Sequence, residues 1–408
     1  MNPFKNSEIK VLHKKKLAFL GGNYYNFNCL EKNYNLHERS KFFARDFYIP
    51  FKILFNSMDN YTRKKLKIQE KKTLLEKCTD KKLKNPKFRN YIEPFISKRM
   101  IELINDCGSF LAFLGDFEME NKKLHKGSFC KNRFCPMCSW RLACKDSLEI
   151  TILMEHLRKE ENKEFIFLTL TTPNVKGYEL DEAIKSYNKS FKKLMERKEV
   201  ENICKGYIRK LEVTYQKERY VTKELWQRKK DYYKKRGLEV GDLEPNYDTY
   251  NPHFHVVIAV NKSYFKKSDL YINHDRWLGL WKESTGDSSI TQVDIRKANV
   301  NDKKEVYELA KYSAKDSEYL ISRPVFEIFY KALKGKQTLV FSGLFKDAHK
   351  MYKLHKLDMY KKQDDIEYVY MLYYNWYKKE YENTKMRELT QDEKEKINKK
   401  LIDVIEVN

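Results

Sequence analysis

The chain has 408 residues, with 82 lysines and arginines against 58 aspartates and glutamates, which gives a formal net charge of +24. Hydrophobic residues make up 41% and aromatic residues 14%, so a disordered chain is excluded and two or three domains are expected. The positive charge favours a polyanionic partner, with nucleic acid ahead of an anionic membrane surface. No apolar run is long enough for a membrane span or a signal peptide. We therefore expect a cytoplasmic protein without a membrane partner, whose cysteines are free thiols or metal ligands.

Residues 1–100 are expected to form a basic N-terminal region. Their lysine-rich run at 62–88 has interspersed charges, which is typical of a solvated helix face more than of a specific DNA contact. Residues 93–120 have helical periodicity, and a further helix is predicted from about Ser139 to Glu160.

A cysteine-rich segment occupies residues 101–150. Cys130, Cys135 and Cys138 form a tight group whose Cys-Pro-x-Cys part resembles a zinc knuckle, and the alternative is three buried free thiols. A tetrahedral zinc ion needs a fourth ligand, for which Cys107 is slightly favoured over His125. The weaker candidate is Cys144. Such a zinc site would be structural, and the basic residues beside it that could face DNA are Lys131, Arg133 and Arg141.

Strand patterns begin after residue 160. FIFLTLTTPNV (165–175), GYIRKLEVTYQ (206–216) and PHFHVVIAV (252–260) are predicted strands, and residues 181–197 are a predicted helix. The last two strands could pair antiparallel with the charged insert 217–249 at the hairpin tip. The insert is either a DNA contact or a plain surface insertion. Strands interleaved with helices, without a regular βαβ rhythm, predict an α+β domain with an antiparallel sheet.

Two histidines lie within the third of these strands. His253 and His255 point to one face while Phe254 points to the other, so two imidazoles converge. The alternative is a chance pair with a structural role. Glu212 in the preceding strand could complete the site if the strands pair, although it could also be an exposed strand residue. A mixed histidine and carboxylate site with open positions suits Mg²⁺ or Mn²⁺ when a substrate brings phosphate oxygens.

Residues 302–321 are a predicted helix on which Glu308 and Tyr312 are neighbours on one face. Lys315 and Tyr319 continue that stripe, which would face outward or into a cleft. A tyrosine can attack phosphorus as a covalent nucleophile, and a nearby carboxylate can act as general base. The alternative is a surface tyrosine beside a salt-bridging glutamate. Residues 326–408 are expected to be a helical C-terminal region, with a tyrosine-rich helix near MLYYNWYKKEY (371–381).

Three segments taken together resemble a known family. FLTLTTPNV (167–175), NPHFHVVIAV (251–260) and YELAKYSAKDSEYL (307–320) resemble, in that order, motifs 1, 2 and 3 of rolling-circle plasmid replication initiators of Gram-positive bacteria. These belong to the one-tyrosine group of the HUH endonuclease superfamily. The segment FCKNRFCPMCSWR (129–141) is similar to that family's upstream region, and the resemblance covers roughly residues 100–325.

The resemblance implies a central antiparallel sheet with flanking helices, together with a metal-dependent nicking and strand-transfer activity. His253 and His255 would hold the divalent ion, with Glu212 as a less secure third ligand. Tyr312 would nick the double-strand origin and stay attached to the new 5′ end, and Glu308 would activate water in the terminating cleavage. Basic residues in the motifs and the cysteine segment are the expected DNA contacts, namely Lys311, Lys315 and Arg133.

The implied partners are plasmid origin DNA, whose hairpin exposes a single-stranded nick site, and a host helicase, DNA polymerase and single-strand binding protein. The expected organisation is a basic region (1–100), a cysteine-rich zinc-binding segment (101–150), a nicking domain (151–325) and a helical C-terminal region (326–408).

Two other functions remain open from the sequence. Conjugative relaxases and some transposases share the histidine pair and the tyrosine, but they act on a transfer origin or a transposon end. A non-catalytic zinc-containing DNA-binding regulator would explain the charge and the cysteines. It would leave the paired histidines and the spacing of Glu308 and Tyr312 as coincidence.

Overall fold

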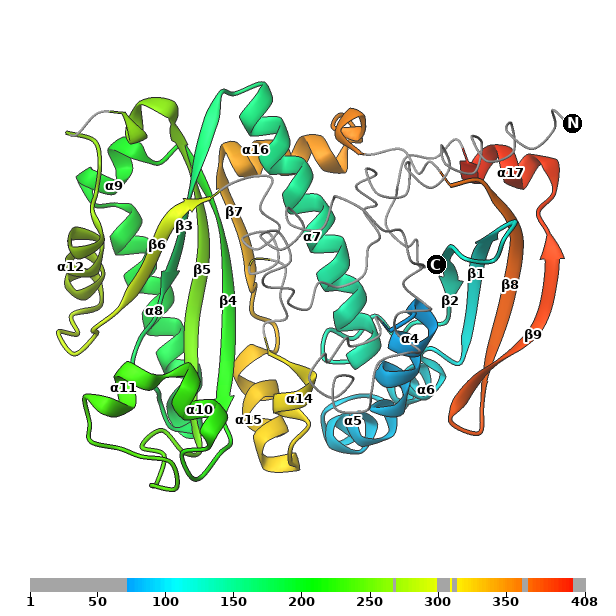
Figure 1. Cartoon of the computed structure of the whole chain (residues 1–408), viewed down its shortest axis with the longest axis horizontal. Coiled ribbons are helices and arrows are strands. Elements are labelled where there is room, and N and C mark those ends of the chain that lie inside the picture. The colour runs from blue at the N-terminus through cyan, green and yellow to red at the C-terminus, as the bar shows by residue number, and fades with distance from the viewer. Residues whose placement is uncertain (1–71, 267–268, 299–308, 310–313, 362–365, 399–408) are drawn as a thin grey trace, which may run out of the picture. The chain divides into compact units, whose positions relative to one another are not determined.

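The computed structural model describes residues 72–266, 269–298, 309, 314–361 and 366–398, all of which lie in the unit Gln69–Asn408 (Figure 1). Among these residues the chain forms two antiparallel sheets with helices around them. The predicted α+β class with a central antiparallel sheet is confirmed.

The larger sheet has five strands in the order β6-β3-β5-β4-β7, and every neighbouring pair is antiparallel. Its strands are β3 (Lys163–Leu170), β4 (Gly206–Gln216), β5 (Thr249–Asn261), β6 (Val293–Ala298) and β7 (Leu339–Gly343). The three strands predicted from the sequence are β3, β4 and β5. The predicted hairpin is also confirmed, because β4 pairs with β5 along its whole length, from Gly206 opposite Ala259 to Gln216 opposite Thr249.

Helices cover both faces of this sheet. On the face towards which Phe254 points, α8 carries Phe191 against that ring, with centroids 5.6 Å apart. The helices associated with this face are α8 (Leu180–Met195), α9 (Lys198–Ile203) and α12 (His274–Thr285). On the histidine face lie α7 (Pro136–Lys159) and α16 (Leu344–Lys353).

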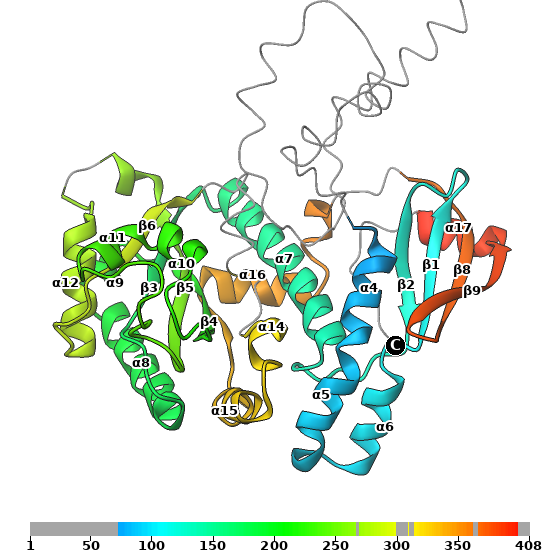
Figure 2. The ribbon, with the colours of Figure 1, turned by 60° about the horizontal axis from the view of Figure 1, so that its bottom comes forward.

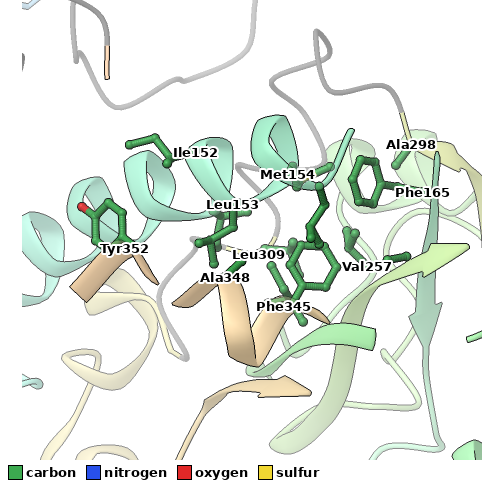
Figure 3. Packing of buried hydrophobic residues seen from close by; sticks show 14 of the residues in the cluster. Ile152, Leu153, Met154, Phe165, Val257, Ala298, Leu309, Phe345, Ala348 and Tyr352 are labelled. Atoms are coloured by element: carbon green, nitrogen blue, oxygen red, sulfur yellow. The ribbon is translucent and has the colours of Figure 1, made fainter. Parts of the chain in front are cut away.

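The main core fills the space between the five-stranded sheet, α7 and α16. Leu153 and Met154 of α7 and Phe345 of α16 meet Phe165 from the sheet in this cluster (Figure 3). Leu309 joins them and is fully buried. Alternate residues of a strand share a face, so Phe165 and His255 lie on the same face of the sheet. Leu309, which belongs to the third sequence motif, therefore packs into the core on the face that carries the histidines.

A second sheet has the order β2-β1-β8-β9, also antiparallel. Its strands are β1 (Phe110–Asp116), β2 (Lys122–Gly127), β8 (Tyr368–Tyr377) and β9 (Glu380–Glu388). The expectation of a wholly helical C-terminal region is wrong here, since the tyrosine-rich segment forms a β-hairpin. The helix predicted over 93–120 likewise ends at Asp106 and gives way to β1.

The turn between β8 and β9 explains why the tyrosine-rich segment was wrongly predicted to be a helix. Lys378 and Lys379 occupy the turn with φ of 44° and 71°, which is a conformation usually taken by Asn-Gly or Gly-Gly. The usual turn signal was therefore absent. Neighbouring β8 residues Met371 and Leu372 are both buried, so the alternation typical of a half-exposed strand was also missing.

The described part of the N-terminal region is helical, as expected. It comprises α4 (Leu74–Leu83), α5 (Asn85–Ile92), η1 (Glu93–Phe95) and α6 (Lys98–Asp106). Helix α4 contacts both α7 and β2 and lies between them in Figure 2. The remaining elements are η2 (Gly177–Glu179), α10 (Lys223–Arg228), α11 (Lys230–Lys234), η3 (Lys262–Phe265), α14 (Asp316–Tyr319), α15 (Arg323–Leu333), η4 (Asp358–Tyr360) and α17 (Gln391–Asn398). No helix within the described ranges has the length and apolar character needed to span a membrane.

Candidate active site and metal centres

The pairing of β4 with β5 brings together the three side chains that the sequence singled out. Glu212 lies directly opposite His253 in the ladder, and directly opposite residues share a face of the sheet. A Glu212 carboxylate oxygen lies 3.0 Å from Nε2 of His255 and 3.4 Å from Nε2 of His253. The carboxylate and the two ring nitrogens therefore converge on one point.

This arrangement fits a small divalent ion. For metal–ligand bonds of about 2.1 Å, adjacent ligand atoms of an octahedron lie about 3 Å apart, close to the observed separations. The ligand atoms of Glu212, His253 and His255 all lie within 4.8 Å of one another. Since three protein ligands leave further coordination positions for water or substrate oxygens, the site has the composition of a catalytic metal centre.

Neighbouring groups orient the two imidazoles. Nδ1 of His253 lies 3.1 Å from the carbonyl oxygen of Asn251, an acceptor, so Nδ1 donates a proton there and Nε2 is the nitrogen turned towards Glu212, where it could bind a metal ion. Nδ1 of His255 lies 3.3 Å from the hydroxyl oxygen of Thr169 on β3. These orienting contacts depend on the strand register, so no local pattern of residues indicated them.

The electrostatics of the cluster favour an ionised carboxylate. Burial alone would raise the pKa of the Glu212 carboxyl, but hydrogen bonds from His253 and His255 outweigh burial and hold that pKa well below its ordinary value. An ionised carboxylate is the form that binds a cation.

Three of the predicted site residues, Glu308, Lys311 and Tyr312, lie outside the described residues. Lys315 is exposed and has an extended backbone, and α14 begins only after it. The predicted helix over 302–321 is therefore wrong at residues 314–315. The exposed stripe is also wrong at Tyr319, because that side chain is only 2% exposed.

Helix α14 is held by side chains from both flanking regions. Asp316 forms ion pairs with Lys81 (2.9 Å) and Lys84 (3.0 Å) of the N-terminal helices. The hydroxyl of Tyr319 donates to the carbonyl oxygen of Phe134 at 2.7 Å, next to the cysteine cluster. These long-range contacts break the simple helical pattern, and no local sequence signal could have found them.

Glu318 links the same helix to the five-stranded sheet. Its carboxylate accepts the backbone N–H of Tyr215 in β4 at 3.0 Å, beyond the point where β7 stops pairing. Burial raises the pKa of the Glu318 carboxyl to about 7, against the hydrogen bond from Tyr215, which lowers it. A second carboxyl thus lies near the Glu212 and His253 side chains.

The cysteines form a second compact group, to which Cys107 contributes the fourth sulfur. Sγ of Cys107 lies 3.5 Å from that of Cys135 and 3.6 Å from that of Cys138, which lies 3.7 Å from Sγ of Cys130. Zinc–sulfur bonds of about 2.3 Å give a tetrahedron with edges of about 3.8 Å, whereas a disulfide needs about 2.05 Å. The four thiols therefore fit a zinc ion.

The fold decides between the candidates for that fourth ligand. Cys107 ends α6, Cys135 precedes α7 and Cys138 lies in its first turn, so the end of one helix meets the start of another. The metal-ligating group found among the described residues includes neither His125 nor Cys144.

Arg133 lies beside this cluster, but its guanidinium is bonded within the protein. It donates to the carbonyl oxygen of Lys336 (2.7 Å) and to the hydroxyl of Thr338 (2.8 Å), and burial lowers its pKa. Arg141 is likewise buried, with its guanidinium 3.5 Å from the ring centroid of Phe129. These placements disfavour DNA contacts by the two arginines and give Arg133 a structural role between the cysteine segment and β7.

Comparison with known proteins adds independent information. A family profile described as "Replication protein" matches residues 121–383. "Protein rep" of Staphylococcus aureus is 47% identical over 249 residues, which cover 61% of this chain and 96% of that protein. "Protein rep" of Streptococcus pneumoniae serotype 2 is 31% identical over 265 residues, covering 64% and 74%. "Protein rep" of a Bacillus species is 30% identical over 282 residues, covering 63% and 81%. No solved structure matches.

Proposed function

Because the chain belongs to the replication protein family, we propose that it initiates rolling-circle replication of a plasmid by nicking one strand at the double-strand origin. The convergence of Glu212, His253 and His255 on one face of the sheet carries the proposal. It supplies three polar ligands that could hold a divalent ion beside a scissile phosphate, in a chain with a net charge of +24.

Tyr312 is the proposed nucleophile. Its phenolic oxygen attacks the scissile phosphorus while the bond from phosphorus to the 3′ oxygen breaks, which leaves a 5′-phosphotyrosine and a free 3′-hydroxyl primer. The phenolic proton passes to a general base and the departing 3′ oxygen takes up a proton. A Mg²⁺ or Mn²⁺ ion bound by Glu212, His253 and His255 would polarise the scissile phosphate. The burial of Leu309 on the histidine face supports this role, since Tyr312 follows only three residues later.

Glu308 is the proposed general base of the terminating cleavage. It would take a proton from the water that cuts the regenerated origin, after which strand transfer closes the displaced circle. In Glu308→Ala we expect nicking to persist and clean termination to be lost, and unchanged termination would contradict the role. Lys311 and Lys315 are the proposed phosphate contacts beside the nucleophile. The exposed side chain of Lys315 is consistent with this role.

Residues 151–325 would carry the nicking chemistry, and residues 101–150 would hold a structural zinc ion that fixes α6 to α7. Residues 326–408 complete both sheets and so support the site from outside the proposed nicking domain. Residues 1–100 remain a proposed basic accessory region. The protein would act in the cytoplasm on origin DNA, together with a host helicase, DNA polymerase and single-strand binding protein.

The proposal is tested by mixing the protein with a labelled single-stranded oligonucleotide that spans the nick site, in the presence of Mn²⁺. A denaturing gel should show a covalent protein–DNA adduct. Tyr312→Phe should abolish it, because phenylalanine has no oxygen to attack phosphorus. Tyr178→Phe is the matched control at a side chain that is 84% exposed, and it should leave the adduct unchanged. Bound DNA with no adduct in the parent protein would favour a non-catalytic regulator.

A further inference from the structure

The connection between β4 and β5, residues 217–248, folds around a small core of its own. We call it the β4–β5 insert. Val221, Leu225 and Tyr233 are almost fully buried in this core, and the hydroxyl of Tyr233 donates to the buried Glu244. The insert therefore holds its surface side chains in a fixed arrangement, although the chemistry proposed above uses none of them.

The helical part of the insert is strongly basic. Between residues 223 and 236 there are seven lysines and arginines against two acidic residues. Six of the basic side chains are exposed, namely Lys223, Arg228, Lys230, Lys234, Lys235 and Arg236. Within the ranges that the structure describes, none of the six forms an ion pair with a carboxylate. A group of exposed cations that form no ion pairs attracts a polyanion, because the polyanion's condensed counterions are released on binding.

Aromatic rings beneath these cations hold some of them in place. Nζ of Lys230 lies 5.7 Å from the ring centroid of Trp226, and the guanidinium carbon of Arg236 lies 3.9 Å from that of Tyr232. Both rings also pack against the insert's small core. They are therefore not free to stack on bases, as single-strand binding would require. Helices α10 and α11 of the insert therefore present mainly charge, which suits the phosphate backbone of a duplex, and the insert's exposed rings, Tyr220 and Tyr247, lie outside these helices.

The insert begins close to the metal centre. The last ladder pair before it is Gln216 opposite Thr249, four residues along β4 from Glu212 opposite His253. At about 3.3 Å per strand residue this is about 13 Å. Since duplex phosphates follow one another every 3.4 Å or so along a strand, this is a reach of about four base pairs. In Figure 1, α10 and α11 lie beside the ends of β4 and β5 that carry the insert, whereas α9 lies towards the opposite ends.

We propose that the β4–β5 insert binds the phosphate backbone of the duplex stem that flanks the nick site. This inference rests on the proposed function, because it takes the Glu212, His253 and His255 centre as the place of scission. The insert would bind the stem of an origin hairpin while the single-stranded nick site lies at the metal centre.

The test uses the full chain and two labelled DNAs with the same nick sequence. One is a short single-stranded oligonucleotide, and the other carries the nick site in a loop on a duplex stem. In the test variant Arg228, Lys234 and Lys235 are all changed to Gln. In the matched control Lys189, Lys193 and Lys198 are changed to Gln, which removes three exposed charges from α8 and α9. Dissociation constants are measured over a range of salt concentrations, and unfolding midpoints confirm that both variants fold.

We expect the insert variant to bind the stem-loop at least tenfold more weakly. The slope of log K against log salt should fall by about two to three, since each lost phosphate contact removes about 0.9. The control should match the parent protein. Equal weakening by both variants, or equal weakening on both DNAs, would overturn the inference, the second result by pointing to the single strand. Failure of the parent protein to form an adduct would contradict the proposed function. The comparison of dissociation constants for the two DNAs would still decide whether the insert binds a duplex stem.

Discussion

The two candidate metal centres differ in their ligands and in what those ligands leave open. The sulfurs of Cys107, Cys130, Cys135 and Cys138 are all buried and fill a tetrahedral set from the protein alone. The centre on the five-stranded sheet offers only a carboxylate and two imidazoles, each oriented by a neighbour. A closed thiolate set stabilises a fold, whereas an open set of hard ligands admits a substrate oxygen. Under the proposed function, the cysteine centre would thus maintain structure and the centre on the five-stranded sheet would perform chemistry.

Helix α14 connects the surroundings of the two centres. Tyr319 reaches the loop before Cys135 through the carbonyl of Phe134, and Glu318 reaches β4 three residues beyond Glu212. The segment that follows the proposed nucleophile is therefore bound to both regions. Changes at one centre, at the other and at this link should have effects of different kinds.

The largest effect should follow from removing a zinc ligand. Cys107→Ser should abolish zinc binding and leave the protein largely unfolded, because structural zinc sites contribute on the order of 10 kcal/mol to folding. Cys144→Ser is the matched control, since that thiol lies outside the cluster. Zinc content by elemental analysis and circular dichroism measure both outcomes. Normal folding of Cys107→Ser with zinc retained would assign the fourth ligand to another residue.

Removing one imidazole from the open centre should impair chemistry and spare the fold. His255→Ala should lower the rate of adduct formation by about 100-fold or more, while zinc content stays that of the parent protein. His355→Ala at an exposed histidine serves as the control and should have no effect on the rate. Single-turnover kinetics at saturating DNA measure the rate. A similar loss in both variants, or loss of zinc in His255→Ala, would remove the distinction between the centres.

Breaking the ion pairs that hold α14 should have a smaller effect than either of these changes. Asp316→Asn leaves two lysines without their carboxylate, and the pair is mostly buried on the aspartate side, so we expect destabilisation by about 2–3 kcal/mol. The Lys81 and Lys84 interactions hold the pKa of Asp316 below its ordinary value despite burial, which alone would raise it. This stabilisation is therefore present near neutral pH and is lost as pH falls below about 4. Urea unfolding at pH 7 and pH 3 measures the difference, which should be smaller at pH 3.

Glu318 should give the smallest effect, with the opposite dependence on pH. Its pKa is about 7 in the folded chain and about 4.3 when unfolded. Between these values the folded state holds a proton that the unfolded chain has released, so stability falls as pH rises. Glu318→Gln removes this dependence and should gain about 1–2 kcal/mol over the parent protein between pH 4 and pH 8. Unfolding curves for the two proteins at both pH values test it, and parallel pH profiles would contradict the raised pKa.

Local patterns were enough to predict the five-stranded sheet's middle. The β-branched and aromatic composition of β3, β4 and β5 predicted strands, strand geometry places His253 and His255 on one face, and the pairing of β4 with β5 adds Glu212 to that face. The choice of Cys107 over His125 could only be slightly favoured, because it depends on α6 meeting α7. Cys107 is far in the sequence from the other three cysteines, so local patterns could not settle the fourth ligand.

The second sheet shows the same limit more strongly. Leu114 of β1 pairs with Met371 of β8, more than 250 residues later, and no local signal indicates such a partner. The contacts of Asp316 with Lys81 and Lys84 also join distant segments. Because such contacts cannot be seen in the local sequence, the helix predicted over 302–321 wrongly included residues 314–315.

The most direct test of the separation between the two centres is to measure zinc content and adduct formation on the same sample after brief treatment with EDTA. We predict that about one zinc ion per chain stays bound while the adduct disappears, and that added Mn²⁺ restores the adduct, because the buried thiolate set exchanges slowly and the open centre does not. An adduct that still forms in EDTA, or one that is lost only together with the zinc, would contradict the assignment of structure to one centre and chemistry to the other.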